Sequence, residues 1–446
     1  MSSTFPLIDS TLPLLTRGYR WAPGLRARHG GGPAVRTRLM GRPAVLLHGT
    51  AAVEFFYDEH HVLRHGALPG PVLDTLFGRG AVHTLDGARH RGRKAMFVSL
   101  LMAEGAVDSL VALAEKHWLS AAEDWRGRQV VLFDEAAAVL AGAVCEWAGV
   151  PLPEEGARQV AEDCTAMVDG FATPGPRHWR ARRARARQEQ ALARTVEAVR
   201  VAGGAPDGSG SPGSPGGPGG SGGLGVPGGP GGCGGPGIPG GGGVLETVAG
   251  HRDTDGRLLD PHTAAVELLN IIRPTVAVSW FTAFAAHALH RTPRLRAELL
   301  AGGDPYARAF AHEVRRFYPF VPFVGGLAAR DLRFGAEDIP EGTMVLLDVH
   351  GHHRGPALWP EPHRFDPLRF LGREPGPAEL IPQGGGDART GHRCPGEDIA
   401  VGLLTALAPA LARLDADIPD QDLRIPLHRV PTRPRSGFVL SVPPAR

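Results

Sequence analysis

One cysteine stands in a setting that could give it a chemical role. Cys394 follows a glycine-rich stretch, 381–393, and Pro395 and Glu397 come directly after it. A proline and a glutamate at these places suit the first turn of a helix that runs on from Asp398. Helix amides should then stabilise a thiolate and lower its pKa, and such a thiolate is a natural axial ligand of haem iron. The alternative is a buried structural cysteine at a helix start.

Two other clusters of ionisable residues have simpler explanations. The stretch 177–187 is rich in arginine, but acidic residues elsewhere balance the charge of the chain. We therefore expect a solvated helix face there rather than a nucleic-acid patch. His350, His352 and His353 follow a strand-like run with no second group of ligands near them in the sequence. We expect no metal at these histidines.

The elements that must position these residues are mostly helices. Apolar residues recur at three- and four-residue spacing in 110–118, 133–148 and 263–290, which is typical of amphipathic and buried helices. This pattern predicts a mainly α chain with a minor β region. The shorter strand-like runs lie at 36–48, where Gly41 marks a hairpin turn, at 324–334, at 343–347, and near 423–442, where we expect a last strand pair.

Composition limits the class of protein. The chain has 446 residues, of which 42% are hydrophobic and 21% charged, and its net charge of +2 argues neither for nor against nucleic acid. The four cysteines form no C-x-x-C pair, so we expect a reducing, cytoplasmic setting. We expect neither a signal peptide nor a membrane anchor, because the longest apolar run, 276–289, is too short to span a bilayer.

A glycine-rich segment interrupts the helical pattern. In 203–243 glycine recurs at every third position from Gly210, with proline and serine between. This is formally the period of collagen. We expect a disordered surface loop inserted into one domain, 1–446, and trimerisation through the segment is the alternative. A single domain of this length needs an organiser, and a buried cofactor would be one.

Further motifs tie the cysteine loop to a known family. Glu313 and Arg316 share a helix face, the segment 348–370 holds Trp-Pro-Glu-Pro and Pro-Leu-Arg-Phe, and Cys394 lies downstream of both. Together they resemble the cytochrome P-450 family over essentially the whole chain except the glycine-rich segment. The resemblance implies the P-450 fold, haem b bound through Cys394, and a structural ion pair of Glu313 with Arg316 that is tied to Arg369.

Departures from the usual motif narrow the resemblance. The common pattern is Phe-x-x-Gly-x-Arg-x-Cys-x-Gly, whereas this chain has Asp387, Thr390 and His392 at the first three fixed positions. The central helix of the usual monooxygenase has an acid–Thr pair, and here Arg273 and Pro274 stand in its place. These departures resemble the bacterial fatty-acid peroxygenase branch of the family.

The resemblance implies a carboxylate site at Arg273. A guanidinium can hold a carboxylate through two hydrogen bonds and stays charged when buried. The acyl chain would lie in an apolar tunnel, with its carboxylate near the iron. Arg273, together with the helix-kinking Pro274, is therefore a candidate catalytic and substrate-binding residue. The alternative is a helix arginine paired with Glu267.

His83 is the third candidate catalytic residue. It follows Gly80 in a loop similar to that of branch members that favour decarboxylation. A histidine there could donate a proton or hold water near the iron. The alternative is a packed loop histidine. His90, Lys94 and His392 are candidates for the haem propionates, since the first two share a helix face. Candidates for lining the acyl tunnel, which are equally ordinary core residues, are Phe77, Phe171 and Phe320.

The resemblance therefore implies an enzyme with haem b as cofactor and hydrogen peroxide as co-substrate. It would oxidise long-chain fatty acids at Cα or Cβ to 2- or 3-hydroxy acids, or decarboxylate them to terminal alkenes. Peroxide already carries the electrons that dioxygen lacks, so no redox partner is required. Two alternatives stay open: a dioxygen-dependent monooxygenase that uses a ferredoxin and reductase, and a non-enzymatic haem-binding sensor.

Overall fold

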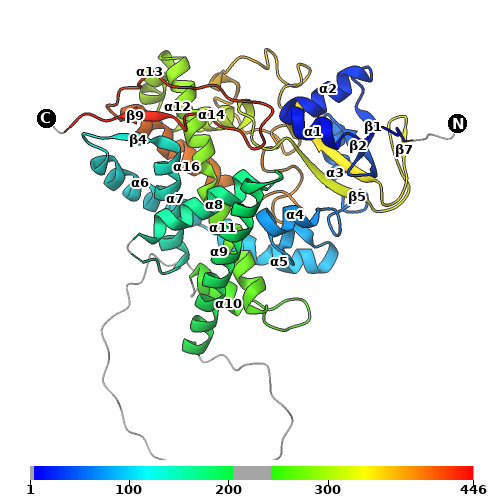
Figure 1. Cartoon of the computed structure of the whole chain (residues 1–446), viewed down its shortest axis with the longest axis horizontal. Coiled ribbons are helices and arrows are strands. Elements are labelled where there is room, and N and C mark those ends of the chain that lie inside the picture. Colours follow the sequence, from blue (N-terminus) through cyan, green and yellow to red (C-terminus); the bar gives the residue numbers. More distant parts are fainter. Residues whose placement is uncertain (1–4, 154, 172, 204–242, 445–446) are drawn as a thin grey trace, which may run out of the picture.

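The computed structural model describes residues 5–153, 155–171, 173–203 and 243–444. The glycine-rich segment expected at 203–243 thus lies outside the described residues, except for its first and last residue. Within the described part, helices form most of the molecule. Most strands gather at one end, on the right of Figure 1, while residues 129–131 and 439–441 form a separate strand pair on the left. The prediction of a mainly α chain with a minor β region is confirmed.

The helices used below fall into three groups along the chain. The first precedes the central helix, the second forms it, and the third follows it. They are α1 (Thr11–Arg17), α2 (Trp21–Arg28), α3 (Thr50–Tyr57), α4 (Gly70–Val72), α5 (Gly87–Leu101), α6 (Ala106–Asp124), α7 (Leu132–Ala148), α8 (Gly156–Gly170), α9 (Pro176–Ala202) and α10 (Val244–Gly250); α11 (Pro261–Val276) and α12 (Val278–Arg291); and α13 (Arg294–Ala301), α14 (Gly303–Phe317), α15 (Val349–His352) and α16 (Glu397–Arg413).

The central helix consists of α11 and α12. It begins where the Asp260 side chain accepts a hydrogen bond from the backbone N–H of Thr263 at 3.0 Å, which is a typical N-cap. Pro274 lies inside α11 and has no N–H to donate to the carbonyl of Asn270, four residues earlier. The run expected as one helix at 263–290 is accordingly divided in two.

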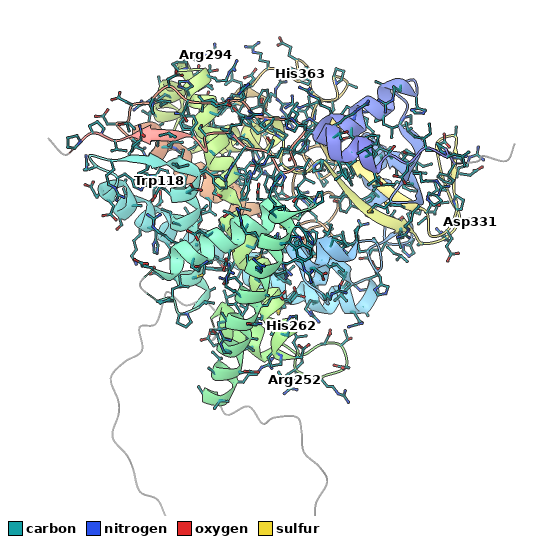
Figure 2. All side chains as sticks on the ribbon, viewed as in Figure 1. Trp118, Arg252, His262, Arg294, Asp331 and His363 are labelled. Carbon is teal, nitrogen blue, oxygen red and sulfur yellow. The ribbon has the colours of Figure 1, made fainter. Side chains whose placement is uncertain are left out.

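Other helices bury this central pair. α11 packs against α7, α8 and α9, and α12 packs against α7, α14 and α16. Within the described ranges, the stretch Pro261–Arg291 is the single helix that is long and apolar enough to cross a membrane. Its most apolar window is 94% buried inside the molecule, as expected for the core helix of a folded domain. Figure 2 shows side chains filling the space between the helices, among them the buried Trp118 of α6.

A five-stranded sheet forms the other end of the molecule. Its strand order is β1-β2-β8-β5-β3, with β2 and β8 parallel and the other pairs antiparallel. Met40 and Gly41 join β1 to β2 with positive φ angles of 51° and 74°, which suits a tight hairpin turn. The strands are β1 (Ala34–Leu39), β2 (Arg42–Leu47), β3 (Val62–Leu63), β4 (Gln129–Val131), β5 (Phe323–Ala328), β6 (Leu332–Phe334), β7 (Glu337–Ile339), β8 (Met344–Asp348) and β9 (Val439–Ser441).

The sequence analysis found the hairpin but misplaced the last strand pair. The expected hairpin at 36–48 is the β1–β2 pair. Near 423–442, however, only β9 forms, and its partner is β4, far back in the chain, with Gln129 opposite Ser441. Strand-like composition shows that a segment can pair, and it does not show which distant segment it will meet.

Candidate active site

The loop that carries Cys394 is fixed from several sides. The Cys394 N–H donates to the Gln383 carbonyl at 3.0 Å, and the Gln383 side-chain oxygen accepts from Arg315 at 2.6 Å. The glycines of this loop lie directly on α3. A Cβ at Gly385 would come within 2.4 Å of Val53, so only glycine lets the loop approach this closely. The cysteine is thus held in one place by the hydrogen bonds and close packing of its own loop.

The electrostatic setting of Cys394 differs from the expected one. α16 begins at Glu397, one residue earlier than predicted, and the Gly396 N–H bonds to the cysteine sulfur. Burial nevertheless raises the pKa of Cys394, and it outweighs the lowering by that N–H and by Lys94. The prediction of a lowered pKa is therefore wrong, because the desolvation of the thiol outweighs the helix amide and the nearby cations.

Arg273 lies on α11 and is almost fully buried, with 6% of its surface exposed. Its Nη2 donates to Asn270 Oδ1 at 3.1 Å, while its Nε has no hydrogen-bond partner. Its Cζ stands 5.7 Å from the centre of the Phe77 ring. Burial and the nearby Arg185 lower the pKa of Arg273 to about 9, so the guanidinium is still a cation at neutral pH.

The alternative partner of Arg273 is engaged elsewhere. Glu267, which is fully buried, forms its ion pair with Arg93 of α5 at 2.7 Å. Its other oxygen accepts from the Asn270 amide at 3.2 Å. Glu267, Asn270 and Arg273 are spaced three residues apart and so share one helix face. Sequence analysis did not assign Asn270 or Arg93, although this regular spacing was a usable signal.

His83 lies on a short helical turn, Val82–Thr84, that faces the same region. Its ring centre is 4.7 Å from that of Phe77, and its buried Nδ1 has no hydrogen-bond partner. Burial, followed by the positive charge of Arg273, lowers the pKa of His83 to about 3. The ring is therefore neutral at physiological pH and can act as a hydrogen-bonding group, not as an imidazolium acid.

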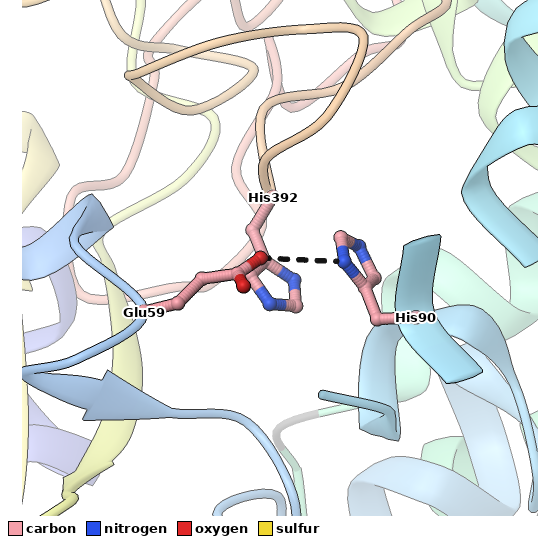
Figure 3. Close-up of side chains that lie close together, drawn as sticks. All are labelled: Glu59, His90 and His392. Atoms are coloured by element: carbon pink, nitrogen blue, oxygen red, sulfur yellow. Dashed lines mark ion pairs between the residues drawn. The ribbon is translucent and has the colours of Figure 1, made fainter. Parts of the chain in front are cut away.

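His90 and His392 meet at another edge of the site. Their rings are stacked with centres 3.9 Å apart, and Glu59 lies beside them, 3.6 Å from His90 (Figure 3). The three side chains offer ligand atoms within 4.8 Å of one another. The lone pairs of two stacked rings lie in nearly parallel planes, however, and do not converge on one ion. We therefore interpret the two histidines as hydrogen-bonding groups, with the Glu59 carboxylate as an acceptor beside them.

The same edge offers a fit for the haem propionates. One Nη of the buried Arg64 has no hydrogen-bond partner, and His90 Nδ1 and His392 Nε2 each have only a carboxylate at 3.6 Å, from Glu59 and Asp86. Buried donors of this kind need acceptors. Lys94 donates to the carbonyl of Arg393, next to the cysteine, and burial lowers its pKa to about 8. These groups suit a ligand with carboxylates at this edge. Arg64 adds to the residues expected from the sequence.

The three phenylalanines expected to line a tunnel lie in different settings. Phe77 is beside both Arg273 and His83. Phe320 belongs to an aromatic cluster, with its ring centre 5.0 Å from that of Phe281 on α12. Phe171 follows α8 and packs, partly buried, against the main core. The structure thus brings only Phe77 to the candidate catalytic residues, and tunnel lining by the other two stays a prediction.

Glu313, Arg316 and Arg369 come together away from these groups. The Arg316 guanidinium bonds the Glu313 carboxylate at 2.6 and 2.7 Å, and both side chains are fully buried. The Arg369 Nε lies 3.7 Å from the same carboxylate. Arg316 also donates to three backbone carbonyls of the segment that follows α15, among them that of His353. The triad therefore joins α14 to this segment.

The arginine-rich stretch is not a uniformly solvated face, as the sequence analysis expected. It forms the first turns of α9, where Arg185 is 2% exposed and donates to the Leu76 carbonyl. Arg177 and Arg187 bind acidic residues of α8. The helix period places every third or fourth residue inward, and a polar sequence conceals which arginine that will be.

Comparison with known proteins gives partial matches among curated sequences. The family model "Cytochrome P450" matches residues 304–441. Cytochrome P450 137 of Mycobacterium tuberculosis is 26% identical over 210 residues, which is 46% of this chain and 43% of that protein. Human cytochrome P450 4A11 is 33% identical over 184 residues, 36% of this chain and 34% of that protein. The chain thus spans less than half the length of these curated relatives.

Solved structures match almost the whole chain. Cytochrome P450SP alpha (CYP152B1) is 38% identical with a TM-score of 0.85, covering 97% of this chain and 98% of that one. Cytochrome P450EX alpha (CYP152N1), solved with myristic acid, is 33% identical with a TM-score of 0.84 and 98% coverage of both chains. A variant of cytochrome P450 OleT in complex with arachidonic acid is 32% identical with a TM-score of 0.86 and the same coverage.

Proposed function

The chain belongs to the cytochrome P450 family, and within that family we propose that it oxidises long-chain fatty acids with hydrogen peroxide. The proposed products are 2- or 3-hydroxy acids and terminal alkenes. Two solved relatives support a fatty-acid substrate class, since they were solved with myristic acid and with arachidonic acid. The proposal includes haem b as cofactor, a cytoplasmic location and no redox partner.

One observation carries this proposal. Among the described residues, no carboxylate pairs with the buried, charged guanidinium of Arg273, and its Nε is without a hydrogen-bond partner. A buried cation is costly unless it is paired. A substrate carboxylate would supply the missing charge and accept two N–H bonds in the fork geometry that arginine favours. The acidic head of a fatty acid has this chemistry, and an uncharged terpene or steroid does not.

Different residues of this chain would then bind the haem and the substrate. Cys394, fixed by its loop, would bind the iron, and His90, His392 and the partly unpaired guanidinium of Arg64 would hold the propionates. Thiolate-bound haem, when present, favours cleavage of the O–O bond of peroxide. Arg273 would orient the substrate so that Cα and Cβ lie nearest the iron. The bound carboxylate, held next to peroxide, could accept and return the proton that bond cleavage requires.

The decisive experiment needs no reductase. Purified haem-loaded protein is mixed with hydrogen peroxide and a series of fatty acids, and products are identified by gas chromatography with mass spectrometry. We expect hydroxy acids or alkenes from the acids and little product from their methyl esters. Arg273→Leu should retain its haem and lose at least about a hundredfold in kcat/KM for the acids, since it removes a charged hydrogen-bonding partner. Cys394→Ala serves as the inactive control.

Three outcomes would contradict parts of the proposal. Equal turnover of acids and esters would remove the carboxylate anchor. Turnover only with dioxygen, a ferredoxin and a reductase would support the monooxygenase alternative. A haem spectrum that fatty acids leave unchanged, with no product under either condition, would support the sensor.

A further inference from the structure

A single buried carboxylate connects the two candidate catalytic residues. Glu267 Oε1 accepts from the backbone N–H of Val82 at 2.8 Å and from Arg93 at 2.7 Å. Its Oε2 accepts from the Asn270 amide at 3.2 Å. Val82 begins the turn that carries His83, and Asn270 binds Arg273. Glu267 is therefore hydrogen-bonded both to the turn that carries His83 and to the partner of Arg273.

The hydrogen bonds of Asn270 have only one consistent direction. Its Nδ2 has two acceptors, the Glu267 carboxylate at 3.2 Å and the Phe77 carbonyl at 3.1 Å. Its Oδ1 is thereby turned toward Arg273 Nη2, at 3.1 Å. A carboxylate and a carbonyl can only accept, and a guanidinium can only donate. The amide is thus locked by partners on both sides.

We propose that Glu267 is a positioning residue, which directs the Arg273 guanidinium through Asn270 and holds the His83 turn through Val82. The proposal rests on the function proposed above. The hydrogen bond to Glu267 fixes the orientation of the Asn270 amide, and the amide oxygen in turn fixes the orientation of Arg273. Because Asn270 is neutral, it places no negative charge beside the guanidinium. The full positive charge of Arg273 is accordingly kept for the substrate, which a direct pair with Glu267 would have neutralised.

Replacing Glu267 by glutamine tests the direction of this chain of bonds. Arg93 and the Val82 N–H can only donate, so the new amide must turn its oxygen toward them. Its NH₂ group then faces the Asn270 amide, which meets a donor where it had an acceptor. An unreversed Asn270 faces that donor with its own NH₂ group, whereas a reversed one turns its oxygen to the Phe77 carbonyl and its NH₂ group to Arg273. In either orientation the chain of bonds from position 267 to the guanidinium is broken.

A double variant separates bonding from charge. In Glu267→Gln with Asn270→Asp, the new glutamine can donate to the new aspartate, which also accepts from Arg273, while the Phe77 carbonyl loses its donor. The negative charge now lies directly beside Arg273, where it competes with the substrate. We expect this variant to bind fatty acid more weakly than the single variant, and haem content and thermal melting show whether it is folded.

The measurement is the dissociation constant of palmitic acid, from the change in haem absorbance on titration of the haem-loaded protein. Imidazole, which binds the iron without using Arg273, is the second probe, and haem content and thermal melting report folding. Loss of one hydrogen bond to a charged group corresponds to about tenfold weaker binding. We expect about that loss for Glu267→Gln and Asn270→Ala, and about a hundredfold loss for the double variant, with imidazole binding unchanged in all three.

The matched control is Asp163→Asn on α8. Asp163 is also a buried carboxylate, 2% exposed, that accepts from an arginine, Arg187, and from a side-chain amide, Gln188 at 2.8 Å. Among the described residues its hydrogen-bond partners are Gln159, Arg187 and Gln188, none of which belongs to the site, so palmitic acid binding should match that of the parent.

The outcomes are distinguishable. If the parent protein does not bind palmitic acid, the proposed function fails and the positioning role fails with it. If the parent binds the acid but Glu267→Gln and the double variant bind it equally well, only the positioning role of Glu267 is wrong. Equal losses of acid and imidazole binding would indicate a structural role alone. Should Glu267→Gln not fold, Asn270→Ala, which leaves the Glu267–Arg93 pair intact, gives the same decision.

Discussion

At the scale of residues, the site is defined by donors that the protein leaves without acceptors. Within the described part of the chain, Arg273 Nε and His83 Nδ1 are buried without hydrogen-bond partners, and His90 Nδ1 and His392 Nε2 each have only a carboxylate at 3.6 Å, from Glu59 and Asp86. A buried donor without an acceptor costs about 1–3 kcal/mol. Polar groups gathered in this way around one region are difficult to explain by packing, and a cofactor and a substrate with carboxylates would pair with them.

His83 is the residue whose role the structure alters most. Its pKa is lowered to about 3, so the ring is neutral and cannot serve as a charged acid. A neutral ring can still hold water or hydrogen-bond to the substrate carboxylate. We predict that His83→Gln lowers the share of alkene relative to hydroxy acid, with only a moderate change in peroxide consumption. Gas chromatography of the products measures this ratio.

The same prediction has a pH signature. Because the His83 ring takes up a proton only near its lowered pKa, the alkene share of the parent should stay constant between about pH 5 and 8. A ratio that follows an ordinary histidine titration in this range would contradict the neutral ring. If His83→Gln leaves the ratio of alkene to hydroxy acid unchanged, or if the parent makes no alkene, His83 is a packed loop residue without a catalytic role.

The sequence allowed prediction of single residues where local spacing carries the information. Cys394 is recognisable from a glycine-rich loop before a helix, whereas Arg273 follows from the resemblance, because an Arg–Pro pair stands where the usual monooxygenase has an acid–Thr pair. Glu267 was considered only as a possible partner of Arg273, because the sequence cannot show that Arg93 of α5 reaches it across 174 positions. Arg185 was missed for the same reason, since its acceptor, Leu76, lies on a distant turn.

At the scale of elements, the polar face of α11 matters more than its length. A regular apolar period predicted the helix, and Pro274 predicted an irregularity in it. The period did not reveal that Glu267, Asn270 and Arg273 form one polar line inside the core. Such a line is stable only if each member finds a partner from another element, and the turn at Val82 and α5 supply those partners.

An ion-pair cluster that joins α8, α9 and the C-terminal segment gives a test of stability. Asp169 on α8 accepts from Arg177 of α9 at 2.8 Å and also pairs with Arg429 of the C-terminal segment. Burial alone would raise the pKa of Asp169, but the hydrogen bonds from both arginines outweigh it and the net shift is downward. We predict that Asp169→Asn lowers the free energy of unfolding by about 1–3 kcal/mol at neutral pH.

The effect should depend on pH in one direction. A carboxylate with a lowered pKa stabilises the folded state above its unfolded pKa, about 3.9, and this contribution disappears as the pH falls through the lowered value. The melting temperatures of parent and Asp169→Asn should therefore converge in acid. Circular dichroism melts over a pH series measure this, with the exposed Asp420→Asn as control. A difference that is constant with pH would contradict the ionic origin.

At the scale of the whole molecule, long-range pairing is what the sequence conceals. Helices were predicted from their own residues, whereas the five-stranded sheet brings together β1, β2, β3, β5 and β8 from both halves of the chain. The β4–β9 pair likewise joins segments about 300 residues apart. Local composition limits which segments can pair, and the shared burial of distant faces decides which ones do.

The segment between α9 and α10 gives the last prediction. The described chain on both sides of it is firmly anchored: Arg200 near the end of α9 donates to the carbonyls of Ala249 and Leu259 at 2.9 and 2.8 Å, and Val244 at the start of α10 is fully buried. These contacts hold the two flanks together without the residues between them. A flexible Gly/Ser linker of about 12 residues reaches roughly 20 Å on average and up to about 40 Å when extended.

We therefore predict that replacing 204–242 by such a linker leaves haem content, melting temperature and peroxide-driven turnover close to those of the parent. The matched variant is Arg200→Gln in the full-length chain, which removes the charged bonds between α9 and α10 and should lower stability by about 1–3 kcal/mol. Calorimetry and analytical ultracentrifugation would measure stability and oligomeric state. A parent trimer that becomes a monomer on deletion would show that the collagen-like period mediates assembly, and a loss of turnover without such a change would show that the segment contributes to the site.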